Sequence, residues 1–117
     1  MAKFIIIGFG AAGEAAAKIL KELSPASRVA VLSDEKSHFY YRLRLCEYIA
    51  GKVDKAALFV DDTIYRKKGI EIIHSRVVNV EPDRVVCESG SSFDFDAMLI
   101  STGGVPNRLR VPGEELS

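Results

Sequence analysis

The chain has 117 residues, which is enough for a single domain with its own hydrophobic core. Its sixteen basic and sixteen acidic residues balance, and the basic residues are scattered, which excludes an extended nucleic-acid-binding surface. The apolar stretch near the N-terminus is too short and too interrupted by glycine for a signal peptide or a membrane span, so we expect a cytoplasmic protein without a membrane partner.

The first predicted elements are a strand at Phe4 to Ile7 and a helix from about Ala11 to Leu23. The sequence GFGAAG, residues 8–13, joins them. Glycines at the first, third and sixth positions of a strand-to-helix turn are typical of dinucleotide-binding sites. The sequence therefore predicts that the diphosphate of a nucleotide lies at the start of this helix.

Each glycine of this turn has a separate predicted role. Gly8 permits the tight corner, Gly10 leaves the backbone open to a pyrophosphate, and Gly13 lets the helix pack closely on the strand. The first helical amides, at Ala11 and Ala12, are expected to face the phosphates. The positive end of the helix dipole then favours an anion without a charged side chain.

A second strand is predicted at Arg28 to Ser33, and Asp34 and Glu35 follow it directly. The ribose of a bound dinucleotide needs a carboxylate acceptor about 20 residues after the glycines. Either acid suits that role, and Glu35 is favoured over Asp34. A carboxylate at this point would repel a 2′-phosphate, so we expect a preference for an adenosine diphosphate moiety without one.

The rest of the chain continues as a mixture of helices and strands. The predicted elements are a short helix from Arg42 to Ala50 closed by Gly51, a helix capped by Asp61 or Asp62 that runs to Lys68, a strand at Ile70 to Ile73, three short antiparallel strands at Val77 to Val80, Arg84 to Glu88 and Ser92 to Phe95, and a last strand at Ala97 to Ser101. The fold class is therefore α/β, a Rossmann-like parallel sheet with a small antiparallel β-meander.

Five segments in this order resemble a known family. They are GFGAAG at 8–13, the acids after Leu32, YYRLRL at 40–45, the meander, and FDAMLISTGGVPN at 95–107. Over nearly the whole chain they are similar to flavoprotein oxidoreductases with two dinucleotide-binding domains, the pyridine nucleotide-disulfide oxidoreductases. The segment YYR followed by RLCEYIAG looks most like the branch that contains NADH:rubredoxin reductases and the flavin domains of nitrite reductases.

The resemblance implies a three-layer ββα FAD-binding fold, in which this segment binds the ADP part of FAD. It also implies NADH as electron donor, bound as NAD(H) in a separate domain, and admits a small electron-carrier protein as acceptor. No catalytic or metal-ligating residue is predicted. The residues expected to contact the cofactor are Gly8, Gly10, Ala11, Ala12, Gly13, Asp34, Glu35, Arg42, Val78, Thr102 and Gly103.

The chain also departs from the family's pattern. Disulfide-reducing members carry a CxxxxC pair, which is absent here, and Cys46 and Cys87 do not match a CxxC metal site either. We expect both thiols to be reduced and Cys46 to pack within a helix, with a single-cysteine peroxidase or a water-forming oxidase as the alternative. Arg42 and Arg44 are candidates for phosphate or flavin contacts, and a solvated helix face is the alternative for Arg44.

Family members return to this domain after their NAD-binding domain, whereas this chain stops at Ser117. We therefore expect a fragment, inactive as an oxidoreductase by itself. Residues 1–110 would form the N-terminal segment of an FAD-binding domain, and residues 111–117 would connect it to the absent NAD-binding domain. The sheet edge at Ala97 to Ser101 is expected to be unpaired, so we also expect the fragment to form a homo-oligomer.

A stand-alone regulatory module that binds NAD(H) or ATP without catalysis is the alternative function. Such modules place their acid at the end of the second strand, where this chain has Ser33, and they have no need of the meander or of the sequence STGG. His38 and His74 are expected to have structural roles under either hypothesis.

Overall fold

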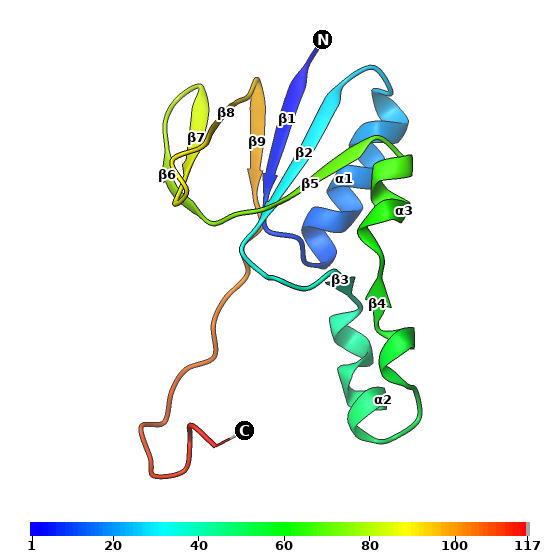
Figure 1. Ribbon diagram of the computed structural model, residues 1–117, viewed down its shortest axis with the longest axis vertical. Coiled ribbons are helices and arrows are strands. Elements are labelled where there is room, and N and C mark those ends of the chain that lie inside the picture. The colour runs from blue at the N-terminus through cyan, green and yellow to red at the C-terminus, as the bar shows by residue number, and fades with distance from the viewer. Residues whose placement is uncertain (117) are drawn as a thin grey trace.

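A four-stranded parallel sheet forms the centre of the computed structural model, which describes residues 1–116 (Figure 1). In spatial order its strands are β5 (Ile70–His74), β2 (Arg28–Ser33), β1 (Lys3–Ile7) and β9 (Ala97–Ile100). β2 is buried from its second residue onward, as expected for a parallel strand that is covered on both faces. The predicted parallel sheet is confirmed, and each strand end lies within one residue of its predicted position.

Helices cover one face of this sheet. α1 (Ala11–Leu23) begins and ends as predicted, and its fully buried Ala17 packs on β1 and β2, because a methyl side chain permits close approach. α3 (Asp62–Lys67) covers the same face and packs against β5 (Figure 1). Asp61 caps α3, since its Oδ1 accepts a hydrogen bond from the Thr63 amide at 2.8 Å.

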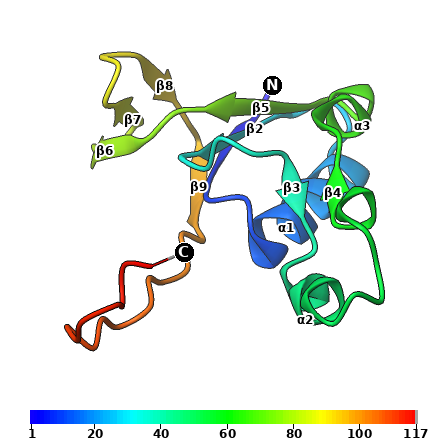
Figure 2. The ribbon, with the colours of Figure 1, turned by 60° about the horizontal axis from the view of Figure 1, so that its bottom comes forward.

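An antiparallel meander covers the opposite face. Its strands are β6 (Val77–Val80), β7 (Arg84–Cys87) and β8 (Ser92–Asp94), in that spatial order. Val85 and Cys87 of β7 are fully buried and belong to the same hydrophobic cluster as Ile5 and Ile7 of β1. Figure 2 shows the meander on one side, the helices on the other and the parallel strands between them, so the predicted meander and α/β class are confirmed.

The segment between β2 and α3 forms a separate projection below α1 and α3 in Figure 1. Its elements are β3 (Phe39–Tyr40), a 3-10 turn at Arg42–Arg44, α2 (Leu45–Ile49), a 3-10 turn at Lys55–Ala57 and β4 (Phe59–Val60). The predicted helix over residues 42–50 is therefore divided into a 3-10 turn and α2. The antiparallel pairing of β3 with β4 was not predicted, because two residues are too few to display an alternating pattern.

Within the described chain, β9 lies at the edge of the sheet and pairs only with β1. Leu99 and Ile100 on this edge strand are 41% and 61% exposed. The chain then runs away from the sheet (Figure 1), and the predicted connector at 111–117 includes Ser117, which lies outside the described residues. Across residues 1–116, every helix is too short or too polar to cross a bilayer.

Candidate functional site

A cleft of about 960 Å³ opens at the carboxyl ends of the parallel strands. Each of the four strands contributes the residues that directly follow it, which is where ligands bind in open α/β sheets. The cleft is lined by Ile7, Gly8, Phe9, Gly10, Ala11, Ala12, Leu32, Ser33, Asp34, Glu35, Arg42, Ser75, Arg76, Val77, Ser101, Thr102, Gly103, Gly104 and Val105.

The three glycines of the turn meet different surroundings. Gly8 has φ +98°, and a Cβ atom there would lie 2.3 Å from the Ser101 carbonyl oxygen. A Cβ atom at Gly13 would lie 2.1 Å from the Gly8 carbonyl oxygen, so the close helix-to-turn packing requires glycine at that position. At Gly10 φ is −88°, and a Cβ atom would meet nothing within 4 Å. The fold therefore requires Gly8 and Gly13, whereas Gly10 leaves empty space facing the cleft.

The N-terminus of α1 also faces the cleft, through Ala11 and Ala12. Gly10 is the N-cap residue and supplies no side-chain hydrogen bond to the first helical amides. Those amides and the helix dipole form an environment that stabilises an anion. The geometry thus provides open space at Gly10 next to backbone donors.

The two predicted acids also line the cleft, in the loop after β2. Arg42 Nη2 lies 3.0 Å from Glu35 Oε1, and its guanidinium lies 5.2 Å from the centre of the Tyr40 ring. Both charged side chains of this pair are well exposed, so the pair adds little to stability in water. The pair places a hydrogen-bond acceptor, Glu35, and a cation, Arg42, side by side in the lining of the cleft.

The end of β9 is tied to the glycine turn by Ser101. Its Oγ lies 3.1 Å from the carbonyl oxygens of both Ile7 and Gly8, so its single O–H proton is shared between these two acceptors. Thr102 and Gly103 follow directly and line the cleft, with Gly103 at φ +69°. β9 and the turn therefore hold each other in place at this wall of the cleft.

Two of the predicted contact residues lie away from the cleft wall. Gly13 is buried in α1, and Val78 is 58% exposed on β6, whereas its neighbour Val77 lines the cleft. Sequence reasoning missed Ser75 and Arg76, which follow β5. Their position directly after a predicted parallel strand could have identified them, because ligands bind at the carboxyl ends of the strands in such sheets.

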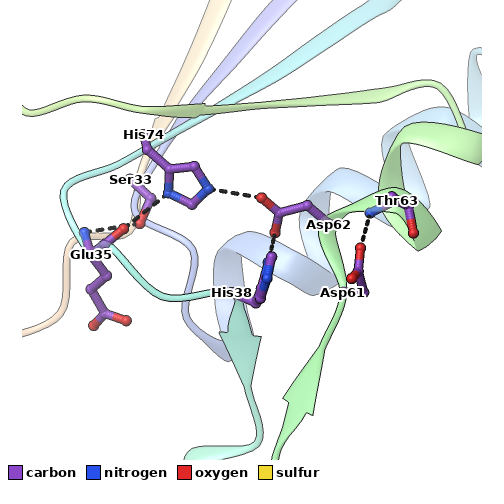
Figure 3. A network of polar contacts seen from close by, with 7 residues as sticks. All are labelled: Ser33, Glu35, His38, Asp61, Asp62, Thr63 and His74. Atoms are coloured by element: carbon purple, nitrogen blue, oxygen red, sulfur yellow. Dashed lines mark hydrogen bonds and ion pairs between the residues drawn. The ribbon is translucent and has the colours of Figure 1, made fainter.

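A polar network joins the loop at Glu35 to the end of β5 and the start of α3 (Figure 3). His74, the last residue of β5, places Nδ1 3.0 Å from the Glu35 carbonyl oxygen and Nε2 2.8 Å from Asp62 Oδ2. The other carboxylate oxygen, Asp62 Oδ1, is buried and lies 3.1 Å from His38 Nδ1, at ion-pair distance but without an aligned hydrogen bond. The Glu35 amide donates to Ser33 Oγ at 3.3 Å.

The charges in this network shift the pKa values of two groups. The hydrogen bond to Asp62, and then the one to the Glu35 carbonyl, raises the pKa of the His74 imidazole above its ordinary value. Burial by itself would raise the pKa of the Asp62 carboxyl, but His74 and His38 outweigh it and hold that pKa below the ordinary value. The prediction of structural roles for both histidines agrees with these contacts.

The remaining candidate groups of the sequence do not form a second site. Cys46 is exposed on α2, so the prediction that it packs within a helix is wrong, and Cys87 is the buried cysteine. The exposure follows from the position of α2 on the projection, away from both hydrophobic clusters. Among residues 1–116, His, Cys, Asp and Glu side chains do not gather in any group of three or more suited to a metal ion.

Comparisons with known proteins agree with this geometry. The sequence matches the family described as pyridine nucleotide-disulphide oxidoreductase over residues 2–117. It is 32% identical to a probable ferredoxin reductase, CtmF, of Castellaniella defragrans, with 98% of this chain and 29% of that protein covered. It is also 32% identical to terpredoxin reductase of a Pseudomonas species, with coverages of 94% and 28%.

Among solved structures, the NADH:rubredoxin oxidoreductase from Clostridium acetobutylicum is similar to this chain. The TM-score is 0.79 at 26% sequence identity, over 95% of this chain and 30% of that one. The chain thus spans less than a third of the length of each of these three proteins.

Proposed function

The chain belongs to the pyridine nucleotide-disulphide oxidoreductase family, and from that premise we propose that its cleft binds the adenosine diphosphate part of FAD. The open space at Gly10 carries this proposal. The protein itself does not need glycine at that position, because a Cβ atom would meet nothing within 4 Å. A ligand phosphate that lies close to the turn would explain why this position carries no side chain.

Each part of the ligand has a partner of suitable chemistry. The amides of Ala11 and Ala12 hold the pyrophosphate at the helix N-terminus. Glu35, with Asp34 as the second choice, accepts hydrogen bonds from the ribose hydroxyls. Arg42 lies beside Glu35 and supplies a cation for a phosphate or for the flavin.

The end of β9 supplies the remaining contacts. Thr102 and Gly103 lie at the cleft wall, where a hydroxyl and an open backbone can reach the cofactor. Val78 is the one predicted contact of this segment that the cleft does not favour, because its neighbour Val77 lines the cleft and Val78 does not.

The proposal extends to a longer protein with a second nucleotide-binding domain. When bound, FAD supplies an electron carrier between NADH and an acceptor. Residues 1–110 then form the first segment of the FAD-binding domain, and residues 111–117 lead to the domain that holds NAD(H). A small electron-carrier protein is the proposed acceptor, supported by the names of terpredoxin reductase and NADH:rubredoxin oxidoreductase.

The edge of the sheet supports a second part of the proposal, that the chain associates with a second copy of itself. In the described part of the chain β9 presents an unpaired strand edge, and its Leu99 and Ile100 are 41% and 61% exposed. We expect light scattering to give at least twice the monomer mass at working concentration. A strict monomer would contradict this part alone.

Calorimetric titration with ADP tests the site. We expect weak binding to the chain, and Glu35→Ala should reduce it by about 1 to 3 kcal/mol, the cost of a lost charged hydrogen bond. Asp34→Ala should cost less. Because Glu35→Ala also releases Arg42 from its ion pair, it should weaken the discrimination against adenosine 2′,5′-bisphosphate.

Glu71→Ala is the matched control, because Glu71 forms an ion pair of the same 3.0 Å length with Arg28 away from the cleft, and its side chain is 46% exposed against 44% for Glu35. It should leave ADP binding unchanged. A larger effect of Asp34→Ala would transfer the ribose role to Asp34. Tighter binding of NAD⁺ than of ADP would favour the regulatory module.

A further inference from the structure

The contacts of His74 determine its protonation state. Its Nδ1 faces the Glu35 carbonyl oxygen at 3.0 Å, and its Nε2 faces Asp62 Oδ2 at 2.8 Å. A carbonyl oxygen and a carboxylate oxygen only accept hydrogen bonds, so both ring nitrogens must carry a proton to make both contacts. A neutral imidazole has one N–H and would lose one of the two.

The loop that carries the predicted ribose acids depends on this ring. We call residues 34–38 the acid loop. None of these residues makes a backbone-to-backbone hydrogen bond within the described chain. At Glu35 the amide donates to Ser33 Oγ, and the carbonyl accepts from His74. Side chains therefore hold the acid loop: His74 contacts its backbone at Glu35, and the side chain of His38, its last residue, lies beside Asp62.

The group on the other side of His74 is rigid. Asp62 is the first residue of α3, and its side chain is 8% exposed. Its two oxygens lie between His74 and His38, so the carboxylate has a fixed orientation. Such a buried carboxylate is a firm anchor, because turning it away would leave a buried charge without a partner.

We propose that His74, as an imidazolium ion, is a positioning residue that fixes the acid loop for ribose recognition by joining the Glu35 backbone to the buried Asp62 carboxylate. This inference rests on the proposed function, in which the acid loop binds the ribose. His74 does not touch the cleft itself. Its effect on the ligand passes through Glu35.

The groups that face His74 determine the direction of its pH response. Asp62 and the Glu35 carbonyl favour the imidazolium, whereas Arg66 on α3 opposes it, and the raised pKa shows that the first two dominate. Because the folded-state pKa of His74 is raised, its stabilising contribution is fully present below the ordinary value near 6.5. It is lost as the pH rises through the raised value. The same contribution also requires an ionised Asp62. Because the pKa of Asp62 is lowered, its protonation removes the contribution only at acidic pH.

A titration by nuclear magnetic resonance tests the inference on the 117-residue chain without any variant. We expect two ring protons on His74 at pH 6, and a change in the Glu35 carbonyl ¹³C shift with the same midpoint as the His74 ring. A single ring proton at pH 6, or a Glu35 signal that stays constant while His74 titrates, would overturn it.

Two glutamine variants separate positioning from general stabilisation. In His74→Gln the pH dependence of the Glu35 signal should disappear. His38→Gln is the matched control, because His38 contacts the same Asp62 carboxylate but not Glu35. It should preserve that dependence, and loss of the dependence in His38→Gln alone would contradict the assignment to His74.

The pH dependence of ADP affinity tests whether His74 influences ligand binding. In the wild-type chain the affinity should fall roughly 3- to 10-fold as the pH passes the His74 midpoint, because one hydrogen bond that positions the Glu35 backbone is lost. In His74→Gln the affinity should be low, and the fall at the His74 midpoint should be missing. Equal ADP affinity on both sides of the midpoint would overturn the positioning role. Absence of ADP binding at every pH would instead contradict the proposed function, and the Glu35 titration would still decide whether His74 holds the loop.

Discussion

Replacing Gly10 with valine is expected to abolish adenine-nucleotide binding while the fold survives. The backbone at Gly10 has φ −88° and ψ −164°, an extended conformation that valine adopts readily. The added side chain meets nothing within 4 Å in the protein and fills the space in front of the first amides of α1. The cost to stability should be about 1 kcal/mol, since valine is a poorer N-cap than glycine.

Two measurements on Gly10→Val check this expectation. Urea denaturation should give a midpoint near that of the wild type, and calorimetry with ADP should give no detectable heat of binding. Ala15→Val, on the exposed side of the same helix, is the control and should bind ADP normally. Unchanged ADP affinity in Gly10→Val would mean that the phosphates lie elsewhere.

Replacing Gly13 with alanine is expected to have the opposite effect, a loss of stability of about 3 kcal/mol or more. The new Cβ atom would lie 2.1 Å from the Gly8 carbonyl oxygen and 3.0 Å from Ser101 Oγ. The first of these is a backbone atom in the tight corner, so relief requires α1 to move away from the turn. The higher helix propensity of alanine, worth about 1 kcal/mol, offsets only part of that cost.

Chemical denaturation of Gly13→Ala measures the loss directly. Gly10→Ala is the matched control, because it adds the same methyl group to the same turn in open space and should change stability by about 1 kcal/mol at most. Equal stability of the Gly13→Ala and Gly10→Ala proteins would show that the turn relaxes easily. The distinction between the fold-requiring and the ligand-facing glycine would then be wrong.

Most of the central fold could be predicted from the sequence because its signals are local. Apolar runs mark the four parallel strands, and the glycine turn marks the start of α1. Turn residues separate the three strands of the meander. The β3–β4 pair escaped prediction, since Phe39 and Val60 pair across a long intervening segment and each strand is only two residues long.

The candidate site could be predicted in part for the same reason. Gly10, Glu35 and Thr102 each belong to a short motif at the end of a predicted strand, and all three line the cleft. Arg76 carries no motif, so its place at the cleft became visible only in the assembled sheet. The exposure of Cys46 was likewise hidden, because the sequence of α2 does not show that this helix lies away from the core.

The sequence by itself determined the parallel sheet, the glycine turn, the meander and the acids after β2, since each depends on the residues within one element or its adjoining turn. Only the tertiary structure decided that His74 joins Glu35 to Asp62, and that Arg42 pairs with Glu35. Those contacts join residues on different elements, and a polar side chain does not encode the identity of a distant partner. Packing of the sheet, the projection and α3 brings the partners within hydrogen-bond distance, and that packing is a property of the whole fold.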